Sequence, residues 1–245
     1  MFKKIIQAIV GRLGYRIVPS NRDAASLMGF LERRPIKTVI DVGASDGKTV
    51  EAWMARYPVA TIYGIEPLPQ SFRLLKNLAE KSGGRVKALN YAVGEKSGMV
   101  NMHFHQDHPT SSSLLNSTSG GLEALPVMAA ETVIEVEQTT LDRIFGVEPE
   151  LVGPILLKMD VQGFEGNVLR GATNLLSSVT YVLTEITVAD CYENQCEFDE
   201  LHNILTAAGF KLMGFSEQFH LEDGAPVYAD VVYVNKRDVA EQMNG

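Results

Sequence analysis

Short apolar runs alternate with amphipathic stretches along most of this chain, and this alternation limits the possible folds more than any other feature. The apolar runs at 38–42, 61–65, 155–159 and 181–186 show no regular alternation of apolar and polar residues. Strands that are apolar on both faces are typical of parallel sheets that helices cover on each side. The sequence therefore predicts an α/β fold with a doubly wound, mostly parallel sheet.

The remaining segments fit the same architecture. Further strands are expected at 86–93, 100–105, 132–136, 210–215 and 227–234. Helices are expected at 48–57, 71–81, 140–145, 164–176 and 198–208. The turn Glu222-Asp223-Gly224 separates the last two strands and predicts a C-terminal antiparallel hairpin. Residues 106–126 are rich in Ser, Thr, Gly and Pro without periodicity, and long loops of this kind often form lids or binding loops.

The composition is that of an ordinary globular protein. Of the 245 residues, 45% are hydrophobic and 21% are charged, which excludes a disordered or fibrous chain. No apolar run approaches the ~18 residues of a membrane-spanning helix. Cys191 and Cys196 are too few for a disulfide framework, which favours a cytoplasmic protein. The net charge of −8 argues against general binding of nucleic acid.

The first 37 residues differ from the rest in charge. They carry eight Lys and Arg against two acidic residues, a net charge of +6, so the remaining residues carry −14. One stripe of a basic helix is apolar, and its residues are Phe2, Ile5, Ile6, Ile9, Val10 and Leu13. Such a helix packs on its own domain or on a second copy of the chain, or it lies on the anionic inner face of a membrane. We expect residues 2–16 to form this contact with a second copy of the chain or with the membrane. The chain then divides into a helix with its connector (1–37), one α/β domain (38–236) and a tail (237–245).

The turn after the first strand points to a nucleotide-like ligand. It reads Asp41-x-Gly43-x-Ser45-x-Gly47, and its glycines let a ligand approach the backbone in front of a helix N-terminus. The dinucleotide pattern G-x-G-x-x-G is absent, which argues against a nicotinamide-dependent oxidoreductase. The turn instead follows the acid-x-G-x-G-x-G pattern of S-adenosylmethionine (SAM) enzymes, with Ser45 in place of the middle glycine. Glu66, at the end of the second strand, is placed to bind the two hydroxyls of a ribose.

A longer run around the fourth parallel strand is more specific. It reads Leu156-Leu157-Lys158-Met159-Asp160-Val161-Gln162-Gly163-Phe164-Glu165 and is followed by Val168-Leu169-Arg170-Gly171-Ala172. This run resembles the "LKIDVEGFE…VLRGA" signature of FkbM-type methyltransferases. Other segments agree in family order over about residues 38–190: Val39-Ile40-Asp41-Val42-Gly43-Ala44, Glu66-Pro67, Ala92-Val93-Gly94 with Gly98, Ser111-Ser112-Ser113-Leu114, Thr139-Thr140-Leu141-Asp142 and Leu183-Thr184-Glu185-Ile186. Gln162 departs from the family, which commonly has Glu at this position.

The resemblance implies the class I methyltransferase fold, a Rossmann-like, mostly parallel sheet of seven strands. It also implies SAM-dependent methylation of a hydroxyl on a small molecule or glycan, of sugar or polyketide type. The cofactor-binding residues that it implies are Asp41, Gly43, Ser45, Gly47, Glu66, Asn90, Ala92 and Asp160. In this assignment the turn holds the methionine end, Glu66 holds the ribose, and Asn90 and Ala92 lie near the adenine.

Methyl transfer to a hydroxyl also needs a base for the acceptor's proton. Asp160, which ends the fourth parallel strand, is the first candidate, although a carboxylate there can instead orient SAM or cap the next helix. Glu185 ends the fifth strand beside Asp160, and His108 or His105 takes the base role if Asp160 does not. We expect no metal ion, because no third ligand accompanies the two carboxylates.

Three functions follow from these patterns. The first is the SAM-dependent O-methyltransferase, the second a nicotinamide oxidoreductase, and the third a non-catalytic adapter that keeps the fold and recruits partners through its basic helix. The residues that argue against the adapter are Asp41, Gly43, Gly47, Glu66 and Asp160. For the enzyme we predict a hydroxyl acceptor, no nucleic-acid partner, and a place in the cytoplasm or against the inner face of the membrane.

Overall fold

The computed structural model describes residues 27–146 and 151–238. The chain divides into two units, residues 1–34 and residues 35–245. The described part of the first unit contains the short helix α2 (Leu27–Glu32). The amphipathic helix and contact surface expected at residues 2–16 lie outside the described residues, as does most of the expected tail, so these expectations stay predictions.

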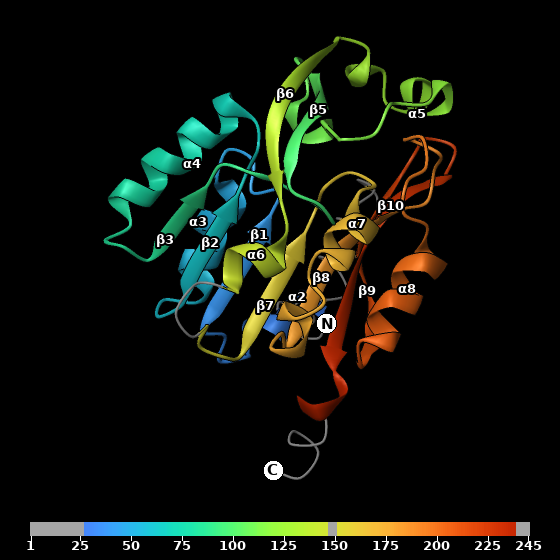
Figure 1. Cartoon of the computed structure of the whole chain (residues 1–245). Coiled ribbons are helices and arrows are strands. Elements are labelled where there is room, and N and C mark those ends of the chain that lie inside the picture. The colour runs from blue at the N-terminus through green and yellow to red at the C-terminus, as the bar shows by residue number, and fades with distance from the viewer. Residues whose placement is uncertain (1–26, 147–150, 239–245) are drawn as a thin grey trace, which may run out of the picture. The chain divides into compact units, whose positions relative to one another are not determined.

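Seven strands of the second unit form one sheet in the order β3–β2–β1–β7–β8–β10–β9 (Figure 1). The strands are β1 (Thr38–Val42), β2 (Thr61–Ile65), β3 (Val86–Leu89), β7 (Ile155–Met159), β8 (Tyr181–Thr187), β9 (Phe210–His220) and β10 (Pro226–Asn235). All pairs from β3 to β8 are parallel, whereas β10 is antiparallel to both of its neighbours. The predicted mostly parallel sheet with a C-terminal antiparallel hairpin is confirmed. The strand order reverses between β1 and β7, and ligands bind at such a switch point.

Helices cover both faces of this sheet. They are α3 (Lys48–Arg56), α4 (Pro69–Lys81), α6 (Leu141–Phe145), α7 (Glu165–Arg170) and α8 (Phe198–Ala207). Val50 of α3 and Leu75 of α4 both pack beside Gly64 of β2, so these two helices lie on the same face. Tyr63 points to the opposite face, where its ring meets that of Phe145 in α6 with centroids 5.1 Å apart.

A second sheet of three strands, in the order β4–β6–β5, follows the carboxyl end of β3. Its strands are β4 (Ala92–Val93), β5 (Gly98–His105) and β6 (Glu131–Thr139). The sequence predicts one strand at 86–93, but the structure breaks it at Asn90. The Asn90 side-chain amide donates to the carbonyl groups of Glu66 and Pro67 at 2.8 and 3.1 Å. The chain therefore turns there, and β4 leaves the main sheet to pair with β6.

Two more segments differ from the sequence expectation. Residues 106–126 contain short helices where no regular structure is expected, namely η2 (Pro109–Ser111), α5 (Ser119–Ala124) and the beginning of η3 (Pro126–Met128). Thr118 caps α5, because its hydroxyl accepts a hydrogen bond from the N–H of Gly121 at 2.8 Å. The single helix expected at 164–176 ends at Arg170, and a separate turn, η4 (Leu175–Ser177), follows. Gly171 caps α7, and a side chain there would overlap the Gly94 carbonyl group.

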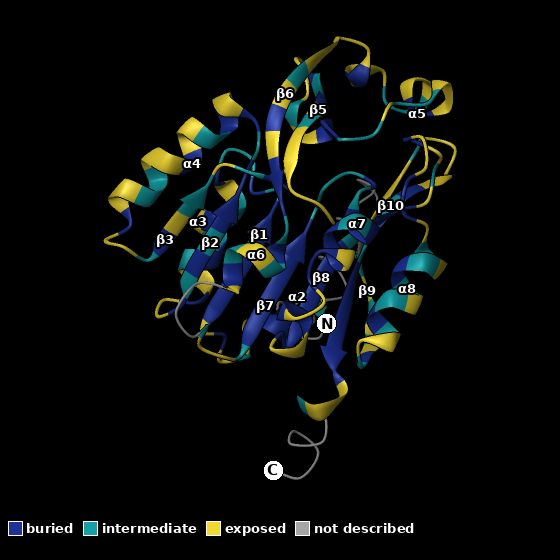
Figure 2. Cartoon of the chain, in the orientation of Figure 1, coloured by how far each residue is buried: buried dark blue, intermediate teal, exposed yellow. Residues whose placement is uncertain are grey.

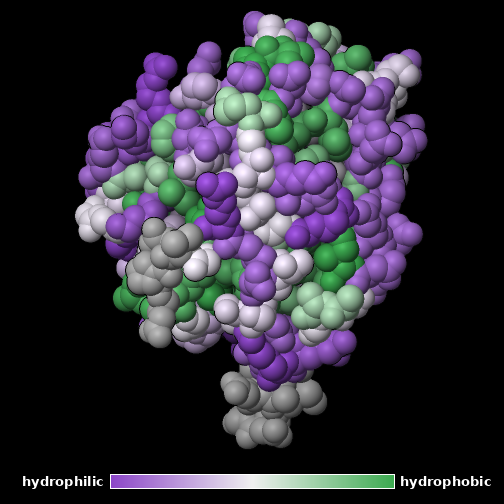
Figure 3. Space-filling model, viewed as in Figure 1, coloured by the Kyte–Doolittle hydropathy of each residue, from purple (hydrophilic) through white to green (hydrophobic). Residues whose placement is uncertain are grey.

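The central strands form the most buried part of the second unit (Figure 2). β1 and β7 are buried at every position, as strands covered on both faces should be. Figure 3 shows mainly hydrophilic residues over the face in view, with smaller hydrophobic areas between them. Among the described residues, no helix is long and apolar enough to cross a membrane.

The chain segments that follow β1 and β7 lie against each other. Gly43 has a φ of +79°, and a Cβ atom there would lie 2.0 Å from the carbonyl oxygen of Asp160. The N–H of Gly43 donates to the carbonyl group of Ile65 at 3.0 Å, which holds this turn against β2. Glycine is therefore required at this position by the left-handed backbone and by the lack of space for a side chain.

We predict that Gly43→Ala lowers the free energy of unfolding by about 2–5 kcal/mol. About 1–2 kcal/mol comes from a side chain in the left-handed region, and about 1–3 kcal/mol comes from the overlap with the Asp160 backbone. Gly84→Ala is the matched control, because Gly84 has a φ of +88° but nothing within 4 Å of a Cβ atom. Urea unfolding measures both variants, and equal losses would show that the overlap with Asp160 contributes nothing.

Candidate active site

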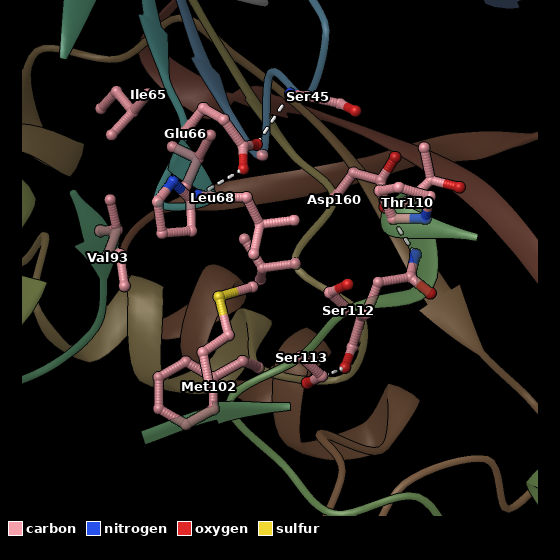
Figure 4. A pocket seen from close by; sticks show the side chains of 18 of the residues that line it. Ser45, Ile65, Glu66, Leu68, Val93, Met102, Thr110, Ser112, Ser113 and Asp160 are labelled. Atoms are coloured by element: carbon pink, nitrogen blue, oxygen red, sulfur yellow. Dashed lines mark hydrogen bonds between the residues drawn. The ribbon is translucent and has the colours of Figure 1, made fainter. Parts of the chain in front are cut away.

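A cavity of about 280 Å³ opens at the carboxyl ends of β1, β2 and β7. The turn after β1, the end of β2 and the segment 109–114 all contribute to its walls (Figure 4). Leu68, Val93 and Met102 provide apolar surface, whereas Glu66 and Asp160 provide carboxylates. An apolar cavity with a few polar groups at one end of a parallel sheet is typical of a small-molecule site.

The predicted glycine turn forms one wall of this cavity. Gly43 and Ser45 line the cavity, whereas Gly47 precedes α3 and lies outside the lining. Ser45 has a φ of 47°, so Gly43, Ser45 and Gly47 all adopt left-handed backbone, unlike Asp41 in β1. The N–H groups of Gly43 and Ala44 both donate to the carbonyl group of Ile65, at 3.0 and 3.1 Å. These bonds fix the turn relative to β2 and its following residue, Glu66.

Glu66 lines the cavity with a carboxylate that is only 4% exposed. Its Oε2 atom accepts a hydrogen bond from the N–H of Ser45 at 2.9 Å, and its Oε1 atom accepts one from the N–H of Leu68 at 2.8 Å. Each carboxylate oxygen can accept a second hydrogen bond, so both remain able to receive a ligand hydroxyl. Burial raises the pKa of Glu66 to about 7, against the opposing effect of the two N–H groups.

Of the two residues expected near the adenine, Ala92 and Asn90, the structure places only Ala92 in the cavity lining. Ala92, at the start of β4, lines the cavity. Asn90 is exposed and lies outside the lining, and its amide instead holds the turn that carries Glu66. Asn90 therefore acts on the site through the backbone of Glu66 rather than by facing the cavity.

A buried ion pair lies behind the turn, and its acid is Asp41, which has the sequence position of a cofactor ligand. Asp41 is fully buried outside the cavity lining, with its Oδ1 atom 3.2 Å from the ammonium nitrogen of Lys158. Its Oδ2 atom accepts a hydrogen bond from the indole N–H of Trp53 at 3.1 Å. Lys158 also lies 3.5 Å from Asp160 Oδ2 and 3.5 Å from the carbonyl oxygen of Gly43. The ammonium group thus connects the glycine turn at residues 43–47 to Asp160, the predicted base.

The structure brings one of the three predicted catalytic residues into the cavity wall. The Asp160 side chain lines the cavity and is 39% exposed. Glu185 lies outside the lining but is joined to Asp160 by the amide of Gln162, which donates to both carboxylates at 2.8 and 3.2 Å. His108 is exposed, outside the lining, and 2.8 Å from the Ser111 hydroxyl. His105 is fully buried, and burial lowers its pKa.

Sequence reasoning did not identify the contacts of Lys158, Gln162 and Tyr192. A lysine inside the apolar run 155–159 is a detectable signal, because a charged residue in a buried strand needs a partner. Nothing in the sequence indicates that Tyr192 lies near Gln162, because the fold alone brings them together. In the part of the chain that the structure describes, no group of three His, Cys, Asp or Glu side chains has a geometry suited to a metal ion.

Comparison with known proteins decides the family. The sequence model of the FkbM methyltransferase domain matches residues 41–212, a range that includes every residue lining the cavity. The chain belongs to the FkbM methyltransferase family. It is therefore a methyltransferase rather than an oxidoreductase or an adapter, and SAM, on which this family depends, is its cofactor. The predicted family, enzyme class and cofactor are confirmed.

Individual relatives of this FkbM methyltransferase are distant. The 2-O-methyltransferase NoeI of Sinorhizobium fredii (strain NBRC 101917 / NGR234) is 23% identical over 185 residues, which cover 73% of this chain and 74% of that protein. The 31-O-demethyl-FK506 methyltransferase FkbM of Streptomyces tacrolimicus is 26% identical over 227 residues, 84% of each chain. The crystal structure of Aeropyrum pernix fibrillarin with bound SAM matches with a TM-score of 0.46 and 14% identity, over 87% of this chain and 74% of that one.

The raised pKa of Glu66 predicts a loss of stability as the pH rises from about 4.5 to about 7. Over this range the folded protein keeps the carboxyl proton and the unfolded chain releases it, so rising pH favours the unfolded chain. Between about pH 5 and about pH 8, we expect the wild-type protein to lose about 2–3 kcal/mol more free energy of unfolding than Glu66→Gln.

Urea unfolding at the two pH values measures this difference. Glu80→Gln is the control, because Glu80 is exposed on α4 and its replacement should leave the wild-type pH dependence intact. If Glu66→Gln shows the same pH dependence as the wild-type protein, burial does not raise the pKa of Glu66.

Proposed function

We propose that this FkbM methyltransferase transfers the methyl group of SAM to a hydroxyl of a small molecule or glycan. The observation that carries the proposal is that Glu66 and Asp160 share one cavity. The first carboxylate suits a ribose and the second suits the hydroxyl of an acceptor. Relatives named for 2-O-methylation and for a 31-O-demethyl substrate support oxygen as the atom that is methylated.

On the cofactor side, Glu66 would hold the ribose hydroxyls with the free lone pairs of its two oxygens. Gly43 and Ser45 would face the methionine end, and the apolar surface of Ala92 and Leu68 would lie against the adenine. When bound, SAM supplies an electrophilic methyl group whose bond to sulfur breaks, with the electron pair staying on sulfur, as the bond to the acceptor oxygen forms. Holding both reactants in line provides much of the rate of such a displacement.

On the acceptor side, Asp160 would take the proton that the hydroxyl loses as its oxygen attacks. This residue combines partial exposure to the cavity with a buried counter-charge, since Lys158 Nζ lies 3.5 Å from its Oδ2 atom. Segment 109–114 would cover the acceptor, because Thr110, Ser112 and Ser113 line the cavity opposite Glu66. Ser112 accepts a hydrogen bond from the N–H of His105 at 3.1 Å and keeps its own hydrogen for a ligand. These hydroxyl groups favour a polyhydroxylated acceptor over a flat apolar one.

A methylation assay tests the proposed function. The protein is incubated with SAM that carries a deuterated methyl group and with a panel of methyl glycosides, uronic acids and secondary alcohols. We expect the label on a hydroxyl oxygen of at least one of these compounds. Label on nitrogen or carbon, or on none of them, would contradict the proposal.

On the acceptor found in this way, we predict that Asp160→Asn lowers kcat by about 10²–10⁴-fold. The amide keeps the shape of the carboxylate but cannot take the proton, so the affinity for S-adenosylhomocysteine should change by less than about threefold. Asp107→Asn, at an exposed position outside the cavity lining, is the control and should keep wild-type turnover. Wild-type turnover in Asp160→Asn would remove Asp160 from the base role.

A further inference from the structure

Gln162 occupies an unusual place two residues after Asp160. Its φ of 56° puts a residue other than glycine in the left-handed region, which few residues adopt without a compensating interaction. The backbone here is held from the acceptor side, because the Ser113 hydroxyl donates to the Gln162 carbonyl group at 2.8 Å. Contacts of the Gln162 side chain are therefore expected to stabilise this conformation.

The amide of Gln162 makes contacts that use both of its ends. Its Nε2 atom donates to Asp160 Oδ1 at 2.8 Å and to Glu185 Oε1 at 3.2 Å, so both amide hydrogens are engaged. Its Oε1 atom lies 3.0 Å from the Tyr192 hydroxyl, which shares its one hydrogen between Gln162 and the Ser111 carbonyl group at 2.8 Å. The Asp160 carboxylate accepts from the amide nitrogen and the Tyr192 hydroxyl donates to the amide oxygen, so one orientation of the amide satisfies both contacts.

Charged and titratable groups surround the two carboxyl groups that Gln162 joins. Burial, followed by the nearby acid Asp160, raises the pKa of Glu185. Asp160 in turn lies beside the ammonium group of Lys158. The other charged or titratable groups that act on this pair come from α7, β1, β10 and the segment after β8, and they are Glu165, Asp41, Asp230, Cys191 and Tyr192. Of the Asp160 and Glu185 carboxyl groups, only that of Asp160 lines the cavity, and the ammonium group of Lys158 lies beside it.

We propose that Gln162 is a positioning residue for methyl transfer, which holds the Asp160 carboxylate toward the acceptor and ties it to β8 and to the segment that covers the acceptor. This inference rests on the proposed function, since it assigns Gln162 a role through Asp160. One hydrogen bond from the amide fixes Asp160 Oδ1, and the second fixes the position of the amide against Glu185. Tyr192 and Ser113 connect the same residue to segment 109–114. An acceptor held against segment 109–114 would then meet a base whose position this segment helps to fix.

The main test is Gln162→Met, which keeps the length of the side chain and removes its hydrogen bonds. We expect kcat to fall about 10–100-fold, as for a small displacement of a reacting group, with the KM for SAM within about twofold of wild type. We also expect the acid limb of the kcat profile to move to higher pH, because the lost hydrogen bond favoured an ionised carboxylate. Gln106→Met, at an exposed position outside the cavity lining, is the matched control and should change neither quantity.

Gln162→Asn distinguishes the effect on kcat of losing the amide contacts from the effect of changing the backbone conformation. Asparagine accepts left-handed backbone more readily than glutamine, but its amide is one methylene too short to reach both carboxylates. We expect the same loss of kcat as in Gln162→Met, whereas wild-type kcat in either variant would overturn the proposal. If neither variant folds, Tyr192→Phe removes only the hydroxyl that anchors the amide, and the proposal then requires a fall in kcat of about 3–10-fold with the same shift of the acid limb.

A readout without catalysis distinguishes failure of this inference from failure of the proposed function. The side-chain carboxyl carbon of Asp160 gives a signal in the ¹³C spectrum of the protein. This signal is assigned by its absence from the spectrum of Asp160→Asn. At neutral pH, with S-adenosylhomocysteine bound, we expect this signal to move in Gln162→Met and to stay in place in Gln106→Met. A protein that methylates no hydroxyl refutes the proposed function, whereas an unmoved Asp160 signal in Gln162→Met refutes the role of Gln162.

Discussion

The buried ammonium group of Lys158 is the interaction on which the site depends. It lies 3.2 Å from Asp41 on the neighbouring strand and 3.5 Å from both Asp160 and the Gly43 carbonyl oxygen. Burial alone would lower the pKa of Lys158, but the carboxylates of Asp41 and Asp160 outweigh it and raise that pKa, so the group stays charged. Burial raises the pKa of Asp41 while Lys158 opposes that rise. Removing Lys158 would leave the buried Asp41 carboxylate without its counter-charge, at a cost of about 3–5 kcal/mol.

The geometry of the cavity follows from this pairing. β1 and β7 lie side by side in register from Thr38 and Ile155 to Val42 and Met159, so their carboxyl ends are level. The residue after β1 is Gly43, whose missing side chain leaves room for the Asp160 backbone. The cofactor turn and the proposed base thus stand next to each other because two strands, one ion pair and one glycine place them there. Asp160 can then face the cavity while the ammonium group of Lys158, which lies outside the cavity lining, pairs with it from behind.

Much of this arrangement is predictable from the sequence, because local pattern and strand ends determine it. Apolar runs such as 61–65 and 155–159 predict the parallel sheet, and the polar residues that follow these two runs, Glu66 and Asp160, fall at one edge of it. Contacts between segments far apart in the chain are not predictable in this way. Asp41 has the sequence position of a cofactor ligand, yet the ion pair with Lys158 and the indole of Trp53 bury it completely. His108 has suitable chemistry for a base, but the short helix η2 leaves it outside the cavity lining.

The proposed function requires that Glu66 and Asp160 lie beside different parts of one bound cofactor, Glu66 at the ribose and Asp160 near the sulfur atom. The most direct test is a crystal structure of the protein with S-adenosylhomocysteine. We predict that the ribose hydroxyls lie within hydrogen-bonding distance of the Glu66 carboxylate, with the amino-acid end beside Gly43 and Ser45 and the sulfur atom directed toward Asp160. A ribose that makes no contact with Glu66, or a ligand bound outside this cavity, would contradict the account.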